Sequence, residues 1–372
     1  MKRALFSFLL LFASLSAYAQ MVWHDPQKSE YSVMQNQAFV DQINGYARLP
    51  ESAKGVVRDA VWNLSRHSAG VAIFFRTNSP DIEVQYTTTS RSYAMPHMPS
   101  TGVSGVDLYR VDGSGDWKYL PGGYSFGEKV TYKYNNLPMP SNGQSYEYRL
   151  YLPLYNGVQS MQIGVKEGCE FSFIPTSTLK PIVMYGTSIA QGGCCSRPAM
   201  AWGTIVHRKL DYPFVNLGFS GNGHLEREVL DYIAQIDAAL YILDCLPNLT
   251  NRNHDDVYKL SLDAIKQIRA KSNAPILLVE HVGFSDEATN TEHRTKVETV
   301  NKAIFALYKD LIKQGEKDIF YLEKEKLSAG GDITVDYIHL TDWGMIQQAE
   351  AVERKVRKIL GSELKNLGKK AK

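Results

Sequence analysis

The chain has 372 residues, of which 41 are Lys or Arg and 39 are Asp or Glu, so its formal net charge is only +2. This balance lacks the excess of positive charge that nucleic-acid binding requires, so no nucleic-acid partner is expected. No apolar run beyond the N-terminus approaches the length of a membrane-spanning helix, and we expect no stable membrane insertion.

The N-terminus has the pattern of a signal peptide. Met1-Lys2-Arg3 precedes an apolar stretch from Ala4 to Leu15, and Ala17-Tyr18-Ala19 is a small-x-small cleavage pattern. The apolar stretch is too short to span a bilayer, so we interpret residues 1–19 as a cleaved signal rather than as an anchor. Its removal leaves 39 basic and 39 acidic residues. The protein is therefore expected to be exported, to the periplasm or the extracellular space.

Residues 20–175 have the pattern of an antiparallel β domain. Apolar and polar residues alternate there, as in strands with one buried face. The alternating runs include residues 70–76, 81–87, 106–111 and 146–152. Asp112-Gly113-Ser114-Gly115 and Asn156-Gly157 are typical of turns in β-hairpins. We therefore expect an N-terminal β-sandwich with hairpins at these two turns.

From residue 176 onwards, short apolar runs alternate with longer amphipathic stretches. The expected strands are 182–185, 214–217, 239–243, 276–280 and 318–322. The expected helices are 201–210, 225–235, 255–271, 292–314 and 341–360. This alternation indicates a parallel sheet between two helical layers, so we expect a three-layer, flavodoxin-like α/β domain over residues 176–364. Residues 365–372 are interpreted as a basic, solvated tail.

The four cysteines are Cys169, Cys194, Cys195 and Cys245. In an exported chain a disulfide is as compatible with the sequence as buried free thiols, and both alternatives stay open. No Cys/His spacing of the zinc type accompanies them, so no metal site is predicted.

A serine, an aspartate and a histidine suit nucleophilic catalysis. Ser188 follows the expected strand 182–185 in a Gly-bracketed turn, at the sheet edge where open α/β folds place their sites. His339 would accept the serine proton, and Asp336, three residues earlier, would orient the imidazole. Taken singly, such residues are more often a helix cap or a surface histidine. His281 is a second candidate base, but it lacks a carboxylate in the matching position.

Two further segments would supply an oxyanion hole, meaning hydrogen-bond donors for the negative oxygen of a tetrahedral intermediate. Gly221 lies in a glycine-rich stretch after the expected strand 214–217, where a backbone N–H can approach a substrate oxygen. Asn248 follows the expected strand 239–243 and offers a side-chain amide. Each segment alone is commonly structural. Their order, each at the end of a strand, favours the catalytic interpretation.

These segments resemble the signature blocks of the SGNH (GDSL-like) hydrolases. The matching blocks are Gly186-Thr187-Ser188-Ile189, Gly218-Phe219-Ser220-Gly221, Pro247-Asn248 and Asp336 to His339. Upstream, Gly105-Val106-Asp107-Leu108-Tyr109 resembles the GxDLY motif of a two-domain bacterial branch with an N-terminal β domain. Thr187 and Leu249 depart from the acidic residues usual at their positions, but neither position belongs to the triad.

The resemblance implies Ser188 as nucleophile, His339 as base and Asp336 as orienter. It also implies an oxyanion hole from the backbone N–H groups of Ser188 and Gly221 and the side chain of Asn248. The expected reaction is acyl transfer to water, which requires no metal and no organic cofactor.

By analogy with exported glycan-active enzymes, we expect a secreted serine esterase that acts on short-chain, acetyl-type esters of an oligosaccharide or another acylated small molecule. The alternatives are a lipase or lysophospholipase with the same triad, and a glycan-binding protein that has lost catalysis. Arg197 and His224 are candidate substrate-binding residues. For Arg197 the alternative is a surface position or a contact with the N-terminal half, and for His224 it is a helix cap.

Overall fold

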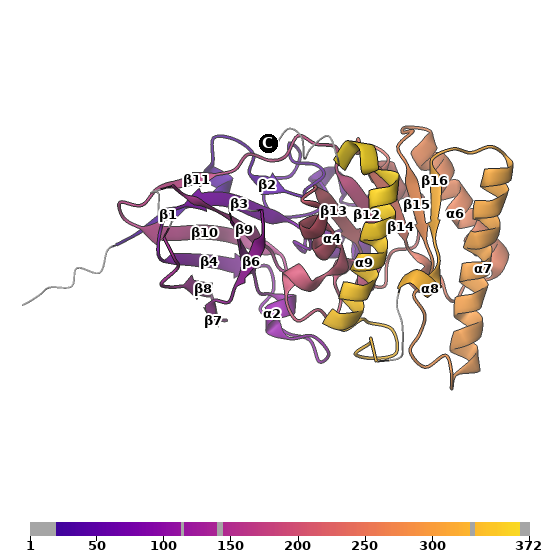
Figure 1. Ribbon diagram of the computed structural model, residues 1–372. Helices are drawn as coiled ribbons and strands as arrows, with labels where there is room; N and C mark the ends of the chain where they lie inside the picture. Colours follow the sequence, from indigo (N-terminus) through magenta and orange to yellow (C-terminus); the bar gives the residue numbers. More distant parts are fainter. Residues whose placement is uncertain (1–19, 113–114, 140–143, 328–331, 365–372) are drawn as a thin grey trace, which may run out of the picture.

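The computed structural model describes residues 20–112, 115–139, 144–327 and 332–364. The expected signal peptide (1–19) and basic tail (365–372) lie outside these residues. Figure 1 shows strands in the N-terminal half of the chain, in indigo to magenta, beside a sheet with helices in the C-terminal half. No helix in the described ranges is both long and apolar enough to cross a membrane.

Two antiparallel sheets form most of the N-terminal half. One has five strands in the order β1 (Met21–His24), β10 (Val158–Lys166), β4 (Ile82–Thr88), β8 (Val130–Tyr134) and β7 (Gly123–Ser125). The other has six: β11 (Phe171–Phe173), β3 (Ala72–Thr77), β9 (Tyr146–Tyr151), β5 (Asp107–Val111) and β6 (Trp117–Leu120), with β2 (Met34–Gln35) also beside β3. Alternate residues of both sheets, such as Phe75, Tyr86 and Ile163, share one core. The predicted β-sandwich is confirmed.

One of the two predicted hairpins is wrong. β5 and β6 do pair across the first turn, with Val111 opposite Trp117, although residues 113–114 lie outside the described ranges. Asn156 and Gly157 instead join β9 to β10, which belong to different sheets. The Asn156 amide, only 1% exposed, donates to the Ser90 carbonyl at 2.8 Å and to Ser104 Oγ at 3.0 Å. An Asn-Gly pair signals a tight turn, but it does not determine which strands pair.

The C-terminal half contains the predicted three-layer structure. Its parallel sheet has five strands in the order β13 (Phe214–Gly218), β12 (Ile182–Gly186), β14 (Leu240–Asp244), β15 (Ile276–Val279) and β16 (Ile319–Leu322). One face is covered by α5 (Arg227–Ile233), α6 (His254–Arg269) and α7 (Thr291–Lys313), and the other by α4 (Trp202–Leu210) and α9 (Asp342–Ile359). Shorter helices are α3 (Ser188–Gln191), α8 (Lys324–Leu327) and the 3-10 turns η3 (Pro198–Met200) and η4 (Leu246–Asn248).

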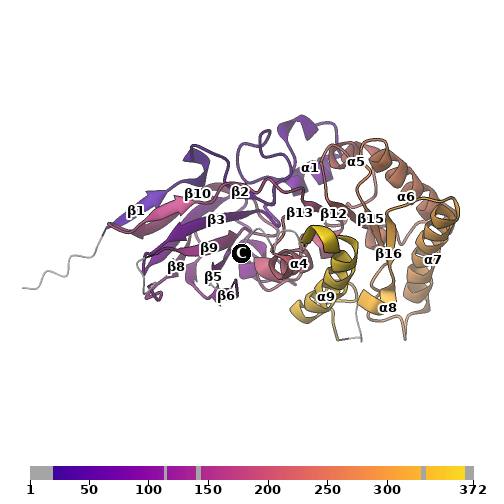
Figure 2. The same ribbon diagram turned by 45° about the horizontal axis from the view of Figure 1, so that its top comes forward.

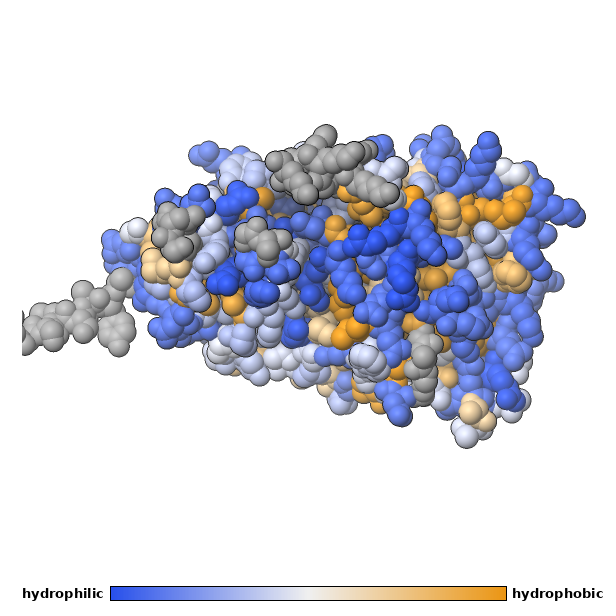
Figure 3. Space-filling model, viewed as in Figure 1, coloured by the Kyte–Doolittle hydropathy of each residue, from blue (hydrophilic) through white to orange (hydrophobic). Residues whose placement is uncertain are grey.

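Strand residues alternate between the two faces of this sheet. Val183 and Tyr185 pack towards α5, α6 and α7, whereas Ile182 and Met184 pack towards α4 and α9. The strands are therefore apolar throughout, which explains why their runs stand out in the sequence. The helices are amphipathic, and hydrophilic residues cover most of the outer surface of α9 (Figure 3).

The sequence pattern did not predict that the N-terminal half contributes to the core of the parallel sheet. Phe39, Leu49 and Val61 are buried in the same cluster as Val215 and Leu217 of β13. The segment includes the 3-10 turn η2 (Glu51–Ala53) and the helix α1 (Asp59–Ser65), and Figure 2 shows α1 beside α5. Two more short helices, η1 (Pro26–Lys28) and α2 (Ser100–Val103), lie in this half.

Side chains of the same segment bind the outer edge of β13. Asn36 Oδ1 accepts a hydrogen bond from the backbone N–H of Phe214 at 3.0 Å. Arg48, which is 3% exposed, donates from Nη1 to the carbonyls of Asn216 at 3.3 Å and Gly218 at 2.6 Å. The halves are thus joined by hydrogen bonds to backbone atoms as well as by apolar packing.

Candidate active site

Ser188 lies at the carboxyl end of β12. The strand ends at Gly186, Thr187 stays extended as the N-cap, and Ser188 begins the short helix α3. This change from strand to helix within two residues turns the serine side chain out of the sheet. Ser188 is 5% exposed, so its hydroxyl lies in a nearly closed environment.

Ser188, His339 and Asp336 form a hydrogen-bonded chain. The Ser188 Oγ lies 2.9 Å from His339 Nε2, and His339 Nδ1 lies 2.7 Å from Asp336 Oδ2. The other carboxylate oxygen, Asp336 Oδ1, accepts the backbone N–H groups of Ile338 at 2.8 Å and His339 at 2.7 Å. The three residues singled out in the sequence are therefore in direct contact, in the order serine, histidine, aspartate.

The carboxylate favours one tautomer of the imidazole. Burial raises the pKa of Asp336, but its hydrogen bonds with the His339 ring and with two backbone N–H groups outweigh this, and the net pKa is lowered. Asp336 is therefore ionised at neutral pH and accepts a proton-bearing Nδ1. The His339 Nε2 lone pair then faces the Ser188 hydroxyl, as a general base requires.

Three hydrogen-bond donors around the serine have no partner among the described residues: the N–H groups of Ser188 and Gly221, and Nδ2 of Asn248. The Asn248 Oδ1 accepts the Gly223 N–H at 3.0 Å, which fixes the side-chain amide and directs its NH₂ group away from Gly223. Gly221 has φ +66°, which side-chain-bearing residues rarely adopt. A Cβ on Gly223 would lie 2.3 Å from the Gly186 carbonyl oxygen, so this loop packs directly on the turn that leads to Ser188.

Gln191, whose role the sequence did not reveal, connects the two loops of the site. It is fully buried; Oε1 accepts the Ser220 N–H at 3.0 Å, and Nε2 donates to the Leu154 carbonyl at 2.9 Å. Nε2 also lies 3.1 Å from His67 Nδ1. The loop that carries Gly221 is therefore held by a side chain from α3, which is in turn held by the N-terminal half. Only the position of Gln191, three residues after Ser188, could have indicated this role.

Arg197 is bound to the GxDLY motif. Its Nη1 donates to Asp107 Oδ2 at 2.9 Å and to the Tyr109 hydroxyl at 2.8 Å, and its guanidinium lies 4.0 Å from the ring centre of Tyr119. Asp107 Oδ2 also accepts the Ala199 N–H at 2.8 Å. The motif thus anchors the segment that follows Ser188 to the β half, which corresponds to the contact considered for Arg197 as an alternative to substrate binding.

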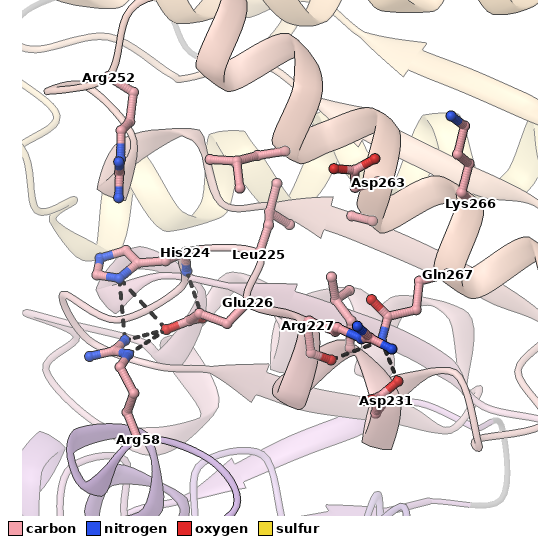
Figure 4. Close-up of a pocket in the computed structure, with 13 residues that line it drawn as sticks. Arg58, His224, Leu225, Glu226, Arg227, Asp231, Arg252, Asp263, Lys266 and Gln267 are labelled. Atoms are coloured by element: carbon pink, nitrogen blue, oxygen red, sulfur yellow. Dashed lines mark hydrogen bonds and ion pairs between the residues drawn. The ribbon is translucent and has the colours of Figure 1, made fainter.

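His224 lines a pocket of about 880 Å³ that extends between α5 and α6. Figure 4 shows Arg252, His224 and Arg58 in succession along one end of this pocket. Arg58 is paired with Glu226 and donates to Asn222 Oδ1 at 2.9 Å, whereas the Arg252 side chain has no hydrogen-bond partner among the described residues. Burial lowers the pKa of His224, so the ring is neutral at neutral pH.

The second candidate base, His281, lies in the core. It is fully buried, and its Nδ1 accepts the Gly283 N–H at 2.8 Å. Burial, with a smaller effect of Lys324, lowers the pKa of His281 to about 3, so it stays neutral.

All four cysteines are free thiols in the structure. Of the described residues, His97, Cys194 and His339 form one group whose ligand atoms all lie within 4.8 Å of one another. They come from three separate segments, so no local spacing in the sequence could have revealed this group.

The comparisons with known proteins agree with the fold. Residues 179–357 match the GDSL-like lipase/acylhydrolase family, and residues 21–171 match GxDLY, the N-terminus of SGNH-hydrolase-type esterases. A protein from Bacteroides ovatus, provisionally described as a GDSL-like lipase, has a crystal structure with 29% identity and a TM-score of 0.83, over 92% of this chain and 98% of that one. No curated protein matches the sequence.

Two more distant structures share the fold over nearly their whole length. Salicylyl-acyltransferase SsfX3 from a tetracycline biosynthetic pathway has 17% identity and a TM-score of 0.68, over 92% of this chain and 97% of that one. A family two carbohydrate esterase from Cellvibrio japonicus has 12% identity and a TM-score of 0.56, over 92% and 99%. With the two family matches and the predicted fold in place, the chain belongs to the SGNH (GDSL-like) hydrolases, in the branch with an N-terminal GxDLY domain.

Proposed function

We propose that the protein is a secreted serine esterase that removes short acyl groups, such as acetyl, from carbohydrate. The observation that carries this proposal is the hydrogen-bonded chain from Ser188 Oγ through His339 to Asp336, with distances of 2.9 Å and 2.7 Å. A serine hydroxyl is a weak nucleophile unless a base takes its proton, and this arrangement supplies the base and its orienting carboxylate.

In the proposed reaction, Ser188 Oγ attacks the ester carbonyl while its proton passes to His339 Nε2. The imidazolium, stabilised by Asp336, then protonates the leaving alcohol, and an acyl-serine remains. Water, deprotonated by His339, attacks this intermediate and releases the acid. Ser188 and His339 thereby return to their starting protonation states.

The negative oxygen that develops in both steps needs fixed donors. The N–H groups of Ser188 and Gly221 and the Asn248 amide are the groups we assign to this role. They have no partner among the described residues, and the loop that carries Gly221 is held by Gln191. Donors held in place before the reaction stabilise the transition state without reorganisation.

Two observations support carbohydrate as the alcohol part of the substrate. His224, which lines the pocket, follows Gly223, and Gly223 packs on the turn that carries the proposed nucleophile. The pocket also contains polar groups, including the unpaired Arg252. These polar groups can form hydrogen bonds with sugar hydroxyls. A family two carbohydrate esterase shares the fold of both halves. We also propose export through residues 1–19 and a boundary between the two domains near residue 175.

The proposal is tested with the purified protein on two panels: acetylated oligosaccharides and esters of increasing acyl length. We expect the highest kcat/KM on acetylated sugars and a steep fall with acyl length. Ser188→Ala should lower the rate by several orders of magnitude, whereas Ser125→Ala, on the exposed strand β7, should not. Faster hydrolysis of long-chain esters would favour a lipase, and an unchanged rate in Ser188→Ala would exclude the proposed nucleophile.

A further inference from the structure

Three side chains that each offer a ligand atom for a metal ion lie close together beside Ser188. Cys194 lies in the turn after α3, His97 lies in the loop between β4 and α2 of the N-terminal half, and His339 is the proposed base. The ring centres of His97 and His339 are 5.7 Å apart, and one ligand atom of each residue lies within 4.8 Å of the others. The β half thus contributes a histidine directly at the reacting groups.

The proposed ester hydrolysis does not use the ring nitrogens of His97 or the sulfur of Cys194. In the described part of the chain, the two ring nitrogens of His97 have no hydrogen-bond partner. The same is true of the Cys194 Sγ. Cys194 is 6% exposed, with its backbone at φ +66°. His97 is exposed, so its ring has room to turn towards a ligand.

Two imidazoles and a thiolate are ligands typical of zinc. In a tetrahedral site with zinc–nitrogen and zinc–sulfur bonds of about 2.1 and 2.3 Å, the ligand atoms lie about 3.3 to 3.6 Å apart. The ligand atoms, which lie within 4.8 Å of one another, therefore have to approach by up to about 1.5 Å, and rotation of the exposed His97 side chain contributes to this approach. Three protein ligands leave a fourth position for water.

We propose that His97, Cys194 and His339 form a binding site for zinc, and that zinc bound there switches the esterase off. His339 Nδ1 is bonded to Asp336, so the ion takes the Nε2 lone pair that otherwise faces Ser188. The Cys194 thiol releases its proton to solvent as the sulfur binds, and no electron is transferred. With Nε2 occupied, His339 cannot accept the serine proton. The inhibition rests on the proposed function, but the binding does not.

Inhibition is measured on the full chain with a short aryl ester and increasing Zn²⁺, each variant being compared with its own metal-free rate. We expect half-inhibition to require at least about tenfold more Zn²⁺ in His97→Ala and in Cys194→Ser, because each variant loses one of three ligands. The matched control is His254→Ala, a half-buried histidine at the start of α6. EDTA should restore the wild-type rate. Equal inhibition of wild type and His97→Ala would overturn the proposal.

Binding is measured separately with Cd²⁺ as probe, on the Ser188→Ala variant, so that the result is independent of catalysis. We expect a thiolate-to-cadmium absorption band that saturates at one ion per chain. The band should disappear when Cys194→Ser is added and persist when Cys169→Ser is added. A band that persists without Cys194, or that depends on Cys169, would overturn the site even if the esterase assignment holds.

Discussion

The phenolic hydroxyl of Tyr155 donates a hydrogen bond to the backbone carbonyl of Ser188 over 3.3 Å. Tyr155 follows β9 in the N-terminal half, so this bond connects the β-sandwich to the proposed nucleophile. The same carbonyl accepts the N–H groups of Gly192 at 3.0 Å and Gly193 at 2.8 Å. The backbone of Ser188 is therefore held by its own turn and by the other half of the chain.

Tyr155→Phe removes this bond and keeps the ring. We expect kcat to fall about five- to tenfold with little change in KM, since one neutral hydrogen bond contributes about 1 kcal/mol and Tyr155 positions the serine rather than the substrate. The comparison is Tyr31→Phe, whose hydroxyl donates to the Phe173 carbonyl far from the site. Rates are measured well below both melting temperatures. A rise in KM alone would instead place Tyr155 in substrate binding.

The Asn248 side chain has an acceptor bound to Gly223 and a donor proposed for the oxyanion hole, and substitution can separate the two. Asn248→Asp keeps an acceptor for the Gly223 N–H but replaces the NH₂ donor by a carboxylate oxygen. We expect kcat to fall by roughly 100-fold or more, with KM nearly unchanged, because the donor acts on the developing oxyanion.

Asn248→Ala should show a similar fall in kcat and also a lower melting temperature, since it leaves Gly223 without its acceptor. Asn222→Ala, in the same loop, is the control. Wild-type kcat in Asn248→Asp would remove Asn248 from the proposed oxyanion hole.

Residues 176–372 alone should not form a stable, active protein. Without the N-terminal half, the apolar surface under Phe39, Leu49 and Val61 is exposed to water. We expect this fragment to be insoluble or to melt at a much lower temperature than the full chain. In the full chain, Arg48→Met should be destabilised by several kcal/mol, because four backbone carbonyls, two of them in buried hydrogen bonds, each lose a hydrogen bond from the guanidinium. A soluble fragment with full activity on the polymeric substrate would show that the β half is dispensable.

Asp244, at the end of β14, gives a pH-dependent prediction. Burial raises its pKa to about 8, against the weaker effect of its hydrogen bond with Gln348. The folded chain therefore holds a proton that the unfolded chain loses above pH 3.8, so this residue's contribution to stability declines as the pH rises from about 4 to about 8.

The Asp244→Asn variant has an amide at this position, which does not ionise as the pH rises. Its free energy of unfolding should exceed that of the wild type by a margin that grows with pH, by up to about 1.4 kcal/mol per pH unit. Urea denaturation at pH 5 and pH 8 measures the margin, with the exposed Asp237→Asn as control. A margin independent of pH would contradict the assigned pKa.

The sequence was sufficient where structure depends on local pattern. All five strands of the parallel sheet were expected within one or two residues of their bounds, because parallel strands are apolar on both faces. Ser188 and His339 stand out because a nucleophile and a base must have particular chemistry at the ends of strands. The geometry between them agrees with that expectation, but their catalytic roles remain predictions.

What the sequence did not reveal depends on contacts between distant segments. Gln191, Tyr155 and Arg48 bind backbone atoms, and a side chain's choice of backbone partner leaves no periodic signal. The helix α1 is short and lies in a region of alternating strand patterns, so its tertiary contacts, rather than its periodicity, determine it. The Asn156-Gly157 turn misled for the same reason, since a turn motif contains no information about sheet membership.

The side chains that bind the edge of β13 also protect the protein from self-association. An outer strand with free backbone N–H and C=O groups is a template for pairing with another chain. Asn36 binds the N–H of Phe214, and Arg48 binds the carbonyls of Asn216 and Gly218, so one such group is occupied at every second residue along the strand. Both lie far ahead of β13 in the sequence and so leave the ribosome first. The strand edge can therefore be covered as soon as it forms, before a neighbouring chain can add to it and begin an aggregate.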